Sequence, residues 1–495
     1  MNIIFWNGGV DWGVSRTVGP YKVAYWLRKH NYTTQVIDFI DFLPGPIVER
    51  MTRKFLTKDT KVLAISTTFL ALTVHTHSNG QKYWISEDKL NILKRIKQEY
   101  PDIKIVLGGY KSEKLAGLGV VDATVMSYTT ASEEIFLEYM DHITKGSEPP
   151  ESVECYWDPN KRPVYNKARN PVYNIEVDDF KWSKQDCILP GEPLPLDISR
   201  GCIFACRFCQ YPHLGKKKLD YIRGMEFLKE EILYNYENFG TTSYYIIDDT
   251  FNDTETKMKA FYDMTQTLPF KITYASYIRA DLVHRFPDTA YYLKESGLYG
   301  AFFGLESLHD EASKTVGKAW SGKTAREFIP ELYHNIWGHN VPIHTNFIVG
   351  ITGETIESID STADWFIQND LHSITFERLG LNGPDDGPVW SIKSEFDKNA
   401  SKYGFTMLPS QPNSIFANWK NDNWTRDTAG YHADRLNKKL ADHRKIVTWS
   451  IPNVMWYGAT RDEIENKRRN EYPQDFFKNA NQEKVLKYCK IVLSM

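Results

Sequence analysis

Short apolar runs, rich in β-branched residues, alternate with helical patterns over the first 145 residues. One helical pattern covers 19–31, and another at 86–100 opens on the capping residue Ser86 and stops before Pro101. Five strand–helix units of this kind predict a doubly wound parallel sheet, which binds ligands at the carboxyl ends of its strands. The expected strands are 2–6, 34–39, 62–67, 103–107 and 123–126.

The same alternation returns between residues 194 and 380. Helical patterns at 225–236, 289–296 and 324–337 separate the apolar runs, and a glycine follows each of the last two. This block predicts a second α/β unit with its chemistry at the carboxyl ends of the strands. The expected strands are 194–198, 243–247, 272–278, 300–305, 344–349 and 373–379.

Two segments lack this pattern. Eight of the 23 prolines lie between residues 146 and 195, among tyrosines and tryptophans, which is typical of an extended linker pinned to a surface. The last 115 residues combine tryptophans with mixed charges and show no recognisable motif. We therefore expect a first domain at 1–145, a linker at 146–193, a second domain at 194–380, and a C-terminal extension at 381–495 that closes the active site.

Composition restricts the class of protein. At 495 residues and 42% hydrophobic, the chain can bury several cores, and its net charge of −3 argues against broad contact with nucleic acid. No apolar run is long enough to cross a membrane, and the first residues lack the basic start of a signal peptide. Cys155, Cys187 and Cys489 are scattered singly, which does not suggest a disulfide framework. We expect a cytoplasmic protein with no membrane partner.

The other three of the six cysteines lie close together. Cys202, Cys206 and Cys209 are spaced C-x3-C-x2-C directly after the expected strand 194–198. Three thiolates at this spacing suit an iron–sulfur cluster, and a [4Fe–4S] cube on three ligands leaves one iron open to substrate. A zinc knuckle completed by His213 is the alternative, although structural zinc sites more often use two separated ligand pairs.

This stretch, with aromatic Phe208 before the last cysteine, resembles the signature of the radical S-adenosylmethionine (SAM) superfamily. The resemblance implies a partial (β/α)6 TIM-like barrel for the second domain. It also implies that the open iron binds the amino and carboxylate groups of SAM. An electron from the cluster would then cleave SAM to a 5′-deoxyadenosyl radical, which abstracts a substrate hydrogen.

Polar residues follow the later strands of this block and resemble segments of the same superfamily. They include Asp248 in a D-D-x-F loop, Arg279 in an R-x-D turn, Glu306 and Ser307 in a G-x-E-S strand end, and Gly350 in a G-x-x-G-E-T turn. The resemblance places Asp248 near the SAM amino group and Arg279 and Glu306 near its carboxylate and ribose. The backbone at 348–350, which includes Gly350, would lie beside adenine.

Purely structural roles are an alternative for several charged residues of these segments. SAM carries both signs of charge and a ribose diol, so its site needs charged groups and hydrogen-bond acceptors. However, Arg279 could simply pair with Asp281, Glu354 could cap the helix it opens, and Lys318 could be solvated.

Small residues follow three expected strands of the first domain. They are Gly8, Gly9, Thr67, Gly108 and Gly109, and small residues there allow a large ligand to approach the backbone. A flavodoxin-like domain before the cysteine motif resembles the cobalamin-binding class of radical SAM enzymes. The D-x-H-x-x-G motif, which supplies a cobalt ligand in some cobalamin proteins, is missing. Both a cobalamin domain and a domain without cofactor are therefore open.

The resemblance implies a radical SAM enzyme that needs a one-electron donor such as flavodoxin or ferredoxin. With cobalamin, methyl transfer to an unactivated carbon is the leading reaction, and rearrangement is another. One alternative is a radical SAM enzyme whose first domain only recognises substrate. The other is a non-catalytic protein stabilised by an iron–sulfur or zinc site. A methylthiotransferase is disfavoured, because residues 1–154 contain no cysteine for a second cluster. The substrate is not predicted.

Overall fold

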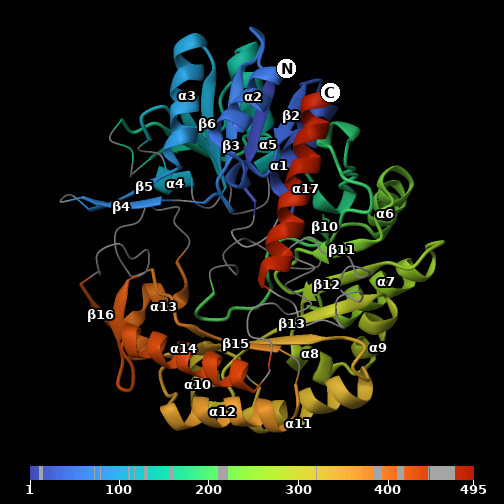
Figure 1. Cartoon of the computed structure of the whole chain (residues 1–495), viewed down its shortest axis with the longest axis vertical. Helices are drawn as coiled ribbons and strands as arrows, with labels where there is room; N and C mark the ends of the chain where they lie inside the picture. Colours follow the sequence, from blue (N-terminus) through green and yellow to red (C-terminus); the bar gives the residue numbers. More distant parts are fainter. Residues whose placement is uncertain are drawn as a thin grey trace.

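The fold is described from a computed structural model. It contains two parallel sheets, one in each half of the chain, which Figure 1 shows at the top and bottom of the view. The structure describes residues 1–9, 15–71, 73–77, 80–109, 112–115, 118–126, 132–155, 158, 160–209, 221–318, 320–371, 373–382, 393–409, 417–443, 445 and 474–495.

The N-terminal sheet has the strand order β2-β1-β3-β6-β7-β9-β8 and is parallel except for the β8–β9 pair. Its strands are β1 (Ile3–Asn7), β2 (Thr34–Ile37), β3 (Val62–Ser66), β6 (Lys104–Gly108), β7 (Ala123–Val125), β8 (Glu151–Glu154) and β9 (Pro163–Lys167). Its helices are α1 (Val18–Lys29), α2 (Gly45–Phe55), α3 (Glu87–Glu99), α4 (Ser112–Leu115) and α5 (Ser132–Lys145).

Alternate residues of β1 enter two separate cores. Phe5 packs against Phe136 of α5, with ring centroids 5.4 Å apart. Trp6 belongs to the core on the other face and donates a hydrogen bond to Thr52 of α2 at 2.9 Å. Helices therefore cover both faces of the sheet, which confirms the predicted doubly wound fold.

The segment at 146–193 is more structured than an extended linker. β9 pairs with β7 and β8 with β9, so the N-terminal sheet continues beyond residue 145. The rest of the segment packs on α1: Trp182 lies against Tyr21, and Lys22 forms an ion pair with Asp178. The prolines and the lack of an alternating apolar pattern concealed these strands, although β8 and β9 pair with each other as neighbours in the sequence.

The second sheet has the order β10-β11-β12-β13-β14-β15, and all its neighbours are parallel. Its strands are β10 (Leu194–Leu196), β11 (Ser243–Ile246), β12 (Thr273–Tyr277), β13 (Leu298–Glu306), β14 (Ile343–Val349) and β15 (Ser373–Arg378). Between them lie α6 (Met225–Phe239), α7 (Glu255–Gln266), α8 (Ala280–Arg285), α9 (Asp288–Glu295), α10 (Asp310–Val316), α11 (Gly322–Glu331), the π-helix η7 (Leu332–Ile336) and α12 (Ile356–Gln368). Six sequential parallel strands confirm the predicted partial barrel.

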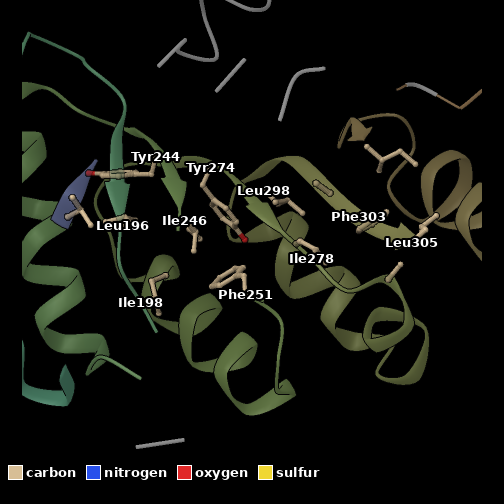
Figure 2. Close-up of a cluster of buried hydrophobic side chains, with 14 of the residues drawn as sticks. Leu196, Ile198, Tyr244, Ile246, Phe251, Tyr274, Ile278, Leu298, Phe303 and Leu305 are labelled. Atoms are coloured by element: carbon tan, nitrogen blue, oxygen red, sulfur yellow. The ribbon is translucent and has the colours of Figure 1, made fainter. Parts of the chain in front are cut away.

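The two faces of this second sheet have different roles. Tyr244 and Tyr274 are opposite each other in β11 and β12, and Tyr274 packs edge-on against Phe261 of α7. Figure 2 shows these two tyrosines in the hydrophobic cluster with Leu196, Ile246 and Phe303. Because side chains alternate along a strand, Tyr277 points to the opposite, inner face.

The C-terminal extension divides between the two halves of the molecule (Figure 1). Its first part packs on the second sheet: the Asn437 side chain of α14 hydrogen-bonds both backbone groups of Phe376 in β15. The last helix, α17, instead joins the N-terminal core, where the Tyr488 hydroxyl accepts a hydrogen bond from the Asp38 amide at 2.8 Å. The elements are α13 (Glu395–Lys398), η8 (Ala400–Tyr403), β16 (Thr406–Leu408), β17 (Asn418–Lys420), α14 (Arg426–Asp442) and α17 (Gln474–Ser494).

A further hairpin that was not predicted lies in the first domain. It consists of β4 (Thr73–His77) and β5 (Gly80–Trp84), which pair antiparallel between β3 and α3. Among the described helices, none combines the length and the apolar character needed to cross a bilayer.

Candidate functional site

The three clustered cysteines lie in an irregular loop after β10. Cys202, Cys206 and Cys209 are all partly exposed, and none forms a disulfide. Gly201 has a φ of 75°, which lets the loop turn sharply away from the strand. The Cys209 amide donates a hydrogen bond to the Cys206 carbonyl at 3.0 Å. The loop therefore presents its three thiols at the carboxyl end of the first barrel strand.

Hydrogen-bond donors lie beside two of these sulfurs. The Thr250 hydroxyl is 3.4 Å from Cys202 Sγ, and Arg279 Nη1 is 3.9 Å from Cys206 Sγ. The Arg279 guanidinium also lies over the Phe204 ring, 4.0 Å from its centroid. Donors near thiolate sulfur stabilise its negative charge and that of a bound cluster. These neighbours fit the thiolate ligands of an iron–sulfur cluster.

A [4Fe–4S] cluster and a single metal ion make different demands on the loop. In the cluster each thiolate binds its own iron, so the sulfurs surround a cube and do not converge on one point. In the described part of the chain, no three His, Cys, Asp or Glu side chains are grouped to hold one metal ion. His213, the candidate fourth zinc ligand, lies outside the described residues.

Asp248 holds the backbone that leads from β10 into the cysteine loop. Its fully buried carboxylate accepts hydrogen bonds from the Ile198 amide at 3.1 Å and from the Ser199 amide and hydroxyl at 2.8 and 2.7 Å. Lys257, equally buried, donates to the same carboxylate at 2.6 Å. These contacts position the start of the loop, and the expected place of Asp248 near the SAM amino group stays a prediction. The adjacent Asp249 is only half-buried.

Arg279 and Asp281 form the ion pair that the sequence allowed. Arg279 Nε and Nη2 donate to the two oxygens of Asp281 at 3.0 and 2.6 Å. The Arg279 backbone amide donates a hydrogen bond to Asn252 Oδ1 at 2.8 Å, which fixes the position of Arg279. Arg279 thus joins the cysteine loop, through Cys206, to the end of β12.

Phe208, the aromatic residue before the last cysteine, is partly buried against the main core.

The end of β13 carries the second charged pair. Glu306 follows a register shift between β13 and β14 and has a φ of 63°, which turns its side chain toward Lys318. Lys318 Nζ lies 2.9 Å from the Glu306 carboxylate and also donates to the Gly304 carbonyl. Lys318 is 13% exposed, so it is a buried partner of Glu306 and not a solvated lysine. Asp281, Ser307 and Lys318 line one small hollow at this end of the barrel.

Glu354 is a buried acid behind this strand end. Ser307 Oγ donates to Glu354 Oε1 at 2.6 Å, while Oε2 is buried without a hydrogen-bond partner in the described structure. The cap of α12 is Thr355, whose side chain accepts from the Ser358 amide, so Glu354 does not cap that helix. Burial raises the pKa of Glu354 to about 8, although the Ser307 hydrogen bond opposes this.

The raised pKa gives a testable pH dependence. The folded protein holds the Glu354 proton up to about pH 8, while the unfolded chain releases it near its ordinary value, so stability falls as pH rises between the two. Glu354→Gln should remove this decline and stabilise the protein at pH 8 by on the order of 4 kcal/mol. Thermal unfolding from pH 5 to 8 measures it. Glu357→Gln, on the exposed face of α12, is the control; parallel slopes for wild type and E354Q would contradict the assignment.

Gly350 lies under the C-terminal extension. Its φ is 107°, and a Cβ there would meet the Trp419 ring at 2.4 Å. The Gly350 carbonyl accepts a hydrogen bond from the side-chain amide of Asn421 at 3.0 Å. The close approach of Trp419 therefore explains this glycine, and any contact of the 348–350 backbone with adenine stays a prediction.

The small residues of the first domain converge at one sheet edge. Gly8 and Gly9 follow β1, Thr67 follows β3, and Gly108 and Gly109 end β6, and these three strands are neighbours. This edge includes the point between β1 and β3 where strand order reverses, the usual ligand crevice of doubly wound sheets.

Packing also accounts for several of these residues. A Cβ at Gly8 would overlap Asp41, and one at Gly9 would overlap Phe42, both in η1 (Ile40–Phe42). The Thr67 hydroxyl donates to the Gly108 carbonyl at 2.9 Å. Gly109 has a φ of 96° and lies against Thr68. Contacts with Asp41, Phe42 and Thr68 therefore explain these three glycines, and binding of cobalamin at this edge stays a prediction.

Sequence reasoning missed a set of side chains on the inner face of the second sheet. They are Tyr277, Phe302, His344, Asn346 and Glu377, which neighbouring strands bring together. Strand alternation could have assigned each to a face, but the register that aligns them is not readable from one sequence.

Comparison with known proteins places this geometry in context. The radical SAM superfamily matches residues 196–366. Bacteriochlorophyllide d C-12(1)-methyltransferase from Chlorobaculum tepidum is 22% identical over 189 residues, which are 38% of this chain and 40% of that protein. The match therefore spans less than half of this relative's length.

Solved structures share the architecture of both halves. The radical SAM methyltransferase TsrM from Kitasatospora setae, with cobalamin and a [4Fe–4S] cluster bound, aligns with a TM-score of 0.63 and 13% identity over 91% of this chain and 93% of its own. The cobalamin-dependent SAM radical enzyme OxsB, with aqua-cobalamin and SAM bound, aligns with a TM-score of 0.61 and 14% identity over 99% of this chain and 71% of its own. At such identities the similarity establishes a common fold.

Proposed function

The chain is an enzyme of the radical SAM superfamily, and we propose that it is a cobalamin-dependent one that transfers a methyl group to an unactivated carbon. The observation that carries the proposal is the cysteine loop at the carboxyl end of β10, with Thr250 and Arg279 beside its sulfurs. A doubly wound domain precedes this barrel, as it does in the cobalamin-dependent neighbours.

Cys202, Cys206 and Cys209 would hold a [4Fe–4S] cluster. When bound, the cluster supplies the electron that cleaves SAM reductively to a 5′-deoxyadenosyl radical, and cobalamin carries the methyl group. The chain's own residues orient these groups: Asp248 and Lys257 fix the loop, and Thr250 and Arg279 contact two of the sulfurs.

Charged groups of both signs at the strand ends suit the polar parts of SAM. Arg279 is a cation 13% exposed beside the loop, and Asp249 is a half-buried acid within electrostatic reach of Cys202. We place the SAM carboxylate toward Arg279 and the ammonium toward Asp249, the neighbour of the residue first expected there. The Glu306–Lys318 pair, with Ser307 next to it, would face the ribose.

The glycine-rich edge of the first domain would hold cobalamin at Gly8, Gly9, Thr67, Gly108 and Gly109. The loop that follows β1 contains no histidine, so this edge would bind the corrin by shape and hydrogen bonds without a cobalt ligand of the D-x-H-x-x-G kind. A reduced flavodoxin or ferredoxin is the expected electron donor. A reducing compartment such as the cytoplasm suits the thiolate-bound cluster.

Anaerobic reconstitution tests this function. The protein is purified with cobalamin supplied and freed of unbound corrinoid, and its visible spectrum is recorded. SAM and dithionite are then added, and 5′-deoxyadenosine is measured. We expect a bound corrinoid spectrum and 5′-deoxyadenosine. Cleavage of SAM without bound corrinoid would contradict the cobalamin assignment, and a corrinoid-loaded, cluster-filled protein that leaves SAM intact would contradict the radical step.

A further inference from the structure

A row of aromatic side chains crosses the inner face of the second sheet. Tyr277 of β12, Phe302 of β13 and His344 of β14 lie opposite one another in the register of the three strands. The ring centroids of Tyr277 and Phe302 are 4.8 Å apart, and those of Phe302 and His344 are 4.7 Å apart. Tyr277 is 36% exposed, so solvent or a ligand reaches one end of this aromatic row.

His344 anchors the other end of the row. Its Nδ1 atom lies 2.8 Å from the Ser373 hydroxyl, and its Nε2 atom lies 3.2 Å from the Thr375 hydroxyl. The side chain is 2% exposed. With both nitrogens engaged, the imidazole has a fixed orientation, and it holds the Phe302 ring in place. The aromatic row is therefore preorganised.

Hydrogen-bond acceptors lie on the adjacent strand ends. Glu377 of β15 is exposed to solvent, and no lysine or arginine of the described chain forms an ion pair with it. Asn346 of β14 hydrogen-bonds Glu377, while its buried Oδ1 atom receives no hydrogen bond within the described structure. Glu377 thus offers a carboxylate, and Asn346 an amide oxygen with no partner, and both would accept from an N–H donor.

The charge balance of this face is negative. Burial and the negative charge of Glu306 raise the pKa of Glu377. Burial, then Glu377 and Asp249, raise the pKa of Tyr277 to about 12. Lys318 is the cation paired with Glu306, and it also donates to the Gly304 carbonyl. A positively charged ligand would relieve the repulsion between the Glu377 and Glu306 carboxylates.

The aromatic row begins next to the cysteine loop. The Phe251 amide donates to the Tyr277 carbonyl at 3.0 Å, and the preceding residue, Thr250, contacts Cys202. Asp249 acts electrostatically on both Cys202 and Tyr277. A molecule bound against Tyr277 would therefore lie beside the proposed reaction centre, where a radical SAM substrate must be.

We propose that this face binds a substrate in which a planar ring is joined to a protonated amine. The ring packs on Tyr277 and Phe302, and the ammonium donates to Glu377 and Asn346 Oδ1. The inference rests on the proposed function, because it names the substrate class of that same site. An anionic or purely aliphatic substrate would leave the carboxylate or the aromatic row unused.

Binding of a probe without turnover tests this substrate class. The probe is phenethylamine, compared with its neutral isostere 2-phenylethanol and with the ringless butylamine. Affinities for the anaerobically reconstituted, unreduced protein are measured by saturation-transfer NMR, with and without saturating SAM. We expect phenethylamine to bind at least 10-fold more tightly than either comparison compound, and SAM to leave this binding in place.

Substitutions test the carboxylate and the aromatic row of the site separately. Glu377→Gln should weaken phenethylamine binding about 10-fold and leave the affinity for 2-phenylethanol unchanged. The variant should therefore lose the preference for the amine. Tyr277→Leu should weaken both ring compounds. Glu357→Gln, an exposed carboxylate on α12, is the matched control and should change neither.

Three results would overturn the proposal: no preference for the amine in the wild type, an E377Q variant with unchanged amine affinity, or displacement of phenethylamine by SAM, which would assign the face to SAM. SAM cleavage is measured separately on the same preparation. Cleavage without amine preference contradicts only this inference, whereas amine binding without cleavage contradicts only the proposed function.

Discussion

We expect Cys206→Ala to abolish the formation of 5′-deoxyadenosine from SAM in the presence of dithionite. The three thiolates of the loop supply all the protein ligands that we assign to the [4Fe–4S] cluster, so the loss of one leaves a second iron without protein support. The variant also removes the sulfur that lies 3.9 Å from Arg279, so this cation loses one of its contacts on the loop. Anaerobic assay of 5′-deoxyadenosine by liquid chromatography, with iron and sulfide content, checks the result.

Cys155→Ala is the matched control. Cys155 is buried in a small cluster with Met126 and Val164, away from the cysteine loop. Its replacement should leave both the iron content and the yield of 5′-deoxyadenosine unchanged. Equal loss of cleavage in both variants would point to general damage, and retention of cleavage in C206A would show that the cluster ligands have been wrongly assigned.

Lys257→Met has the largest expected effect on stability. Lys257 and Asp248 are both fully buried and 2.6 Å apart, and Lys257 also donates to the Ser199 hydroxyl at 2.9 Å. Methionine would leave a buried carboxylate without its cation, which costs about 3–5 kcal/mol. Because Asp248 holds the amides that begin the cysteine loop, we expect cluster loading to fall together with the urea midpoint.

The same helix offers a control for this substitution. Lys259 pairs with Asp263 on the exposed face of α7, where both side chains are more than half accessible. Lys259→Met should cost less than about 1 kcal/mol, because exposed ion pairs contribute little. Adding Asp248→Asn to K257M removes the unpaired charge and should recover part of the stability. Equal effects of the two lysine substitutions would refute the supporting role of the buried pair.

Local patterns were sufficient to predict the two sheets. All the predicted strands are present, with ends that differ by at most two residues, because each is a short apolar run between glycine, proline or polar residues. β8 and β9 were not found, since ESVE is polar and mostly exposed and PVYNK begins with a proline, so neither shows the apolar pattern of a strand. The packing of α17 on the N-terminal core was missed for the same reason.

The candidate site was predicted unevenly. The cysteine loop is a contiguous motif, so its spacing alone located it. Asp248 was recognised as part of the site, but its partners depend on burial: Lys257 and Ser199 bond to it and tie it to the start of the loop, while its place near the SAM amino group stays a prediction. Glu377 and Tyr277 gave no signal, because their proximity requires the register of β12–β15.

The interface between the two halves could not be predicted from the sequence either. Arg16 is fully buried and bonds to Glu192 at 2.9 Å, to Tyr21 at 2.6 Å and to two backbone carbonyls. The barrel residue Tyr245 donates to the Arg16 carbonyl. A lone arginine in a sequence reads as solvated, and only the three-dimensional contacts show that it joins the first domain to the barrel.

The most direct test of the account is electron paramagnetic resonance of the anaerobically reconstituted, dithionite-reduced protein before and after SAM is added. We predict the signal of a reduced [4Fe–4S] cluster whose g-values change when SAM binds to the iron that the protein leaves open. A cluster signal that SAM does not alter, or the absence of any cluster in protein with all three cysteines intact, would contradict the assignment of Cys202, Cys206 and Cys209 as the centre of a radical SAM enzyme.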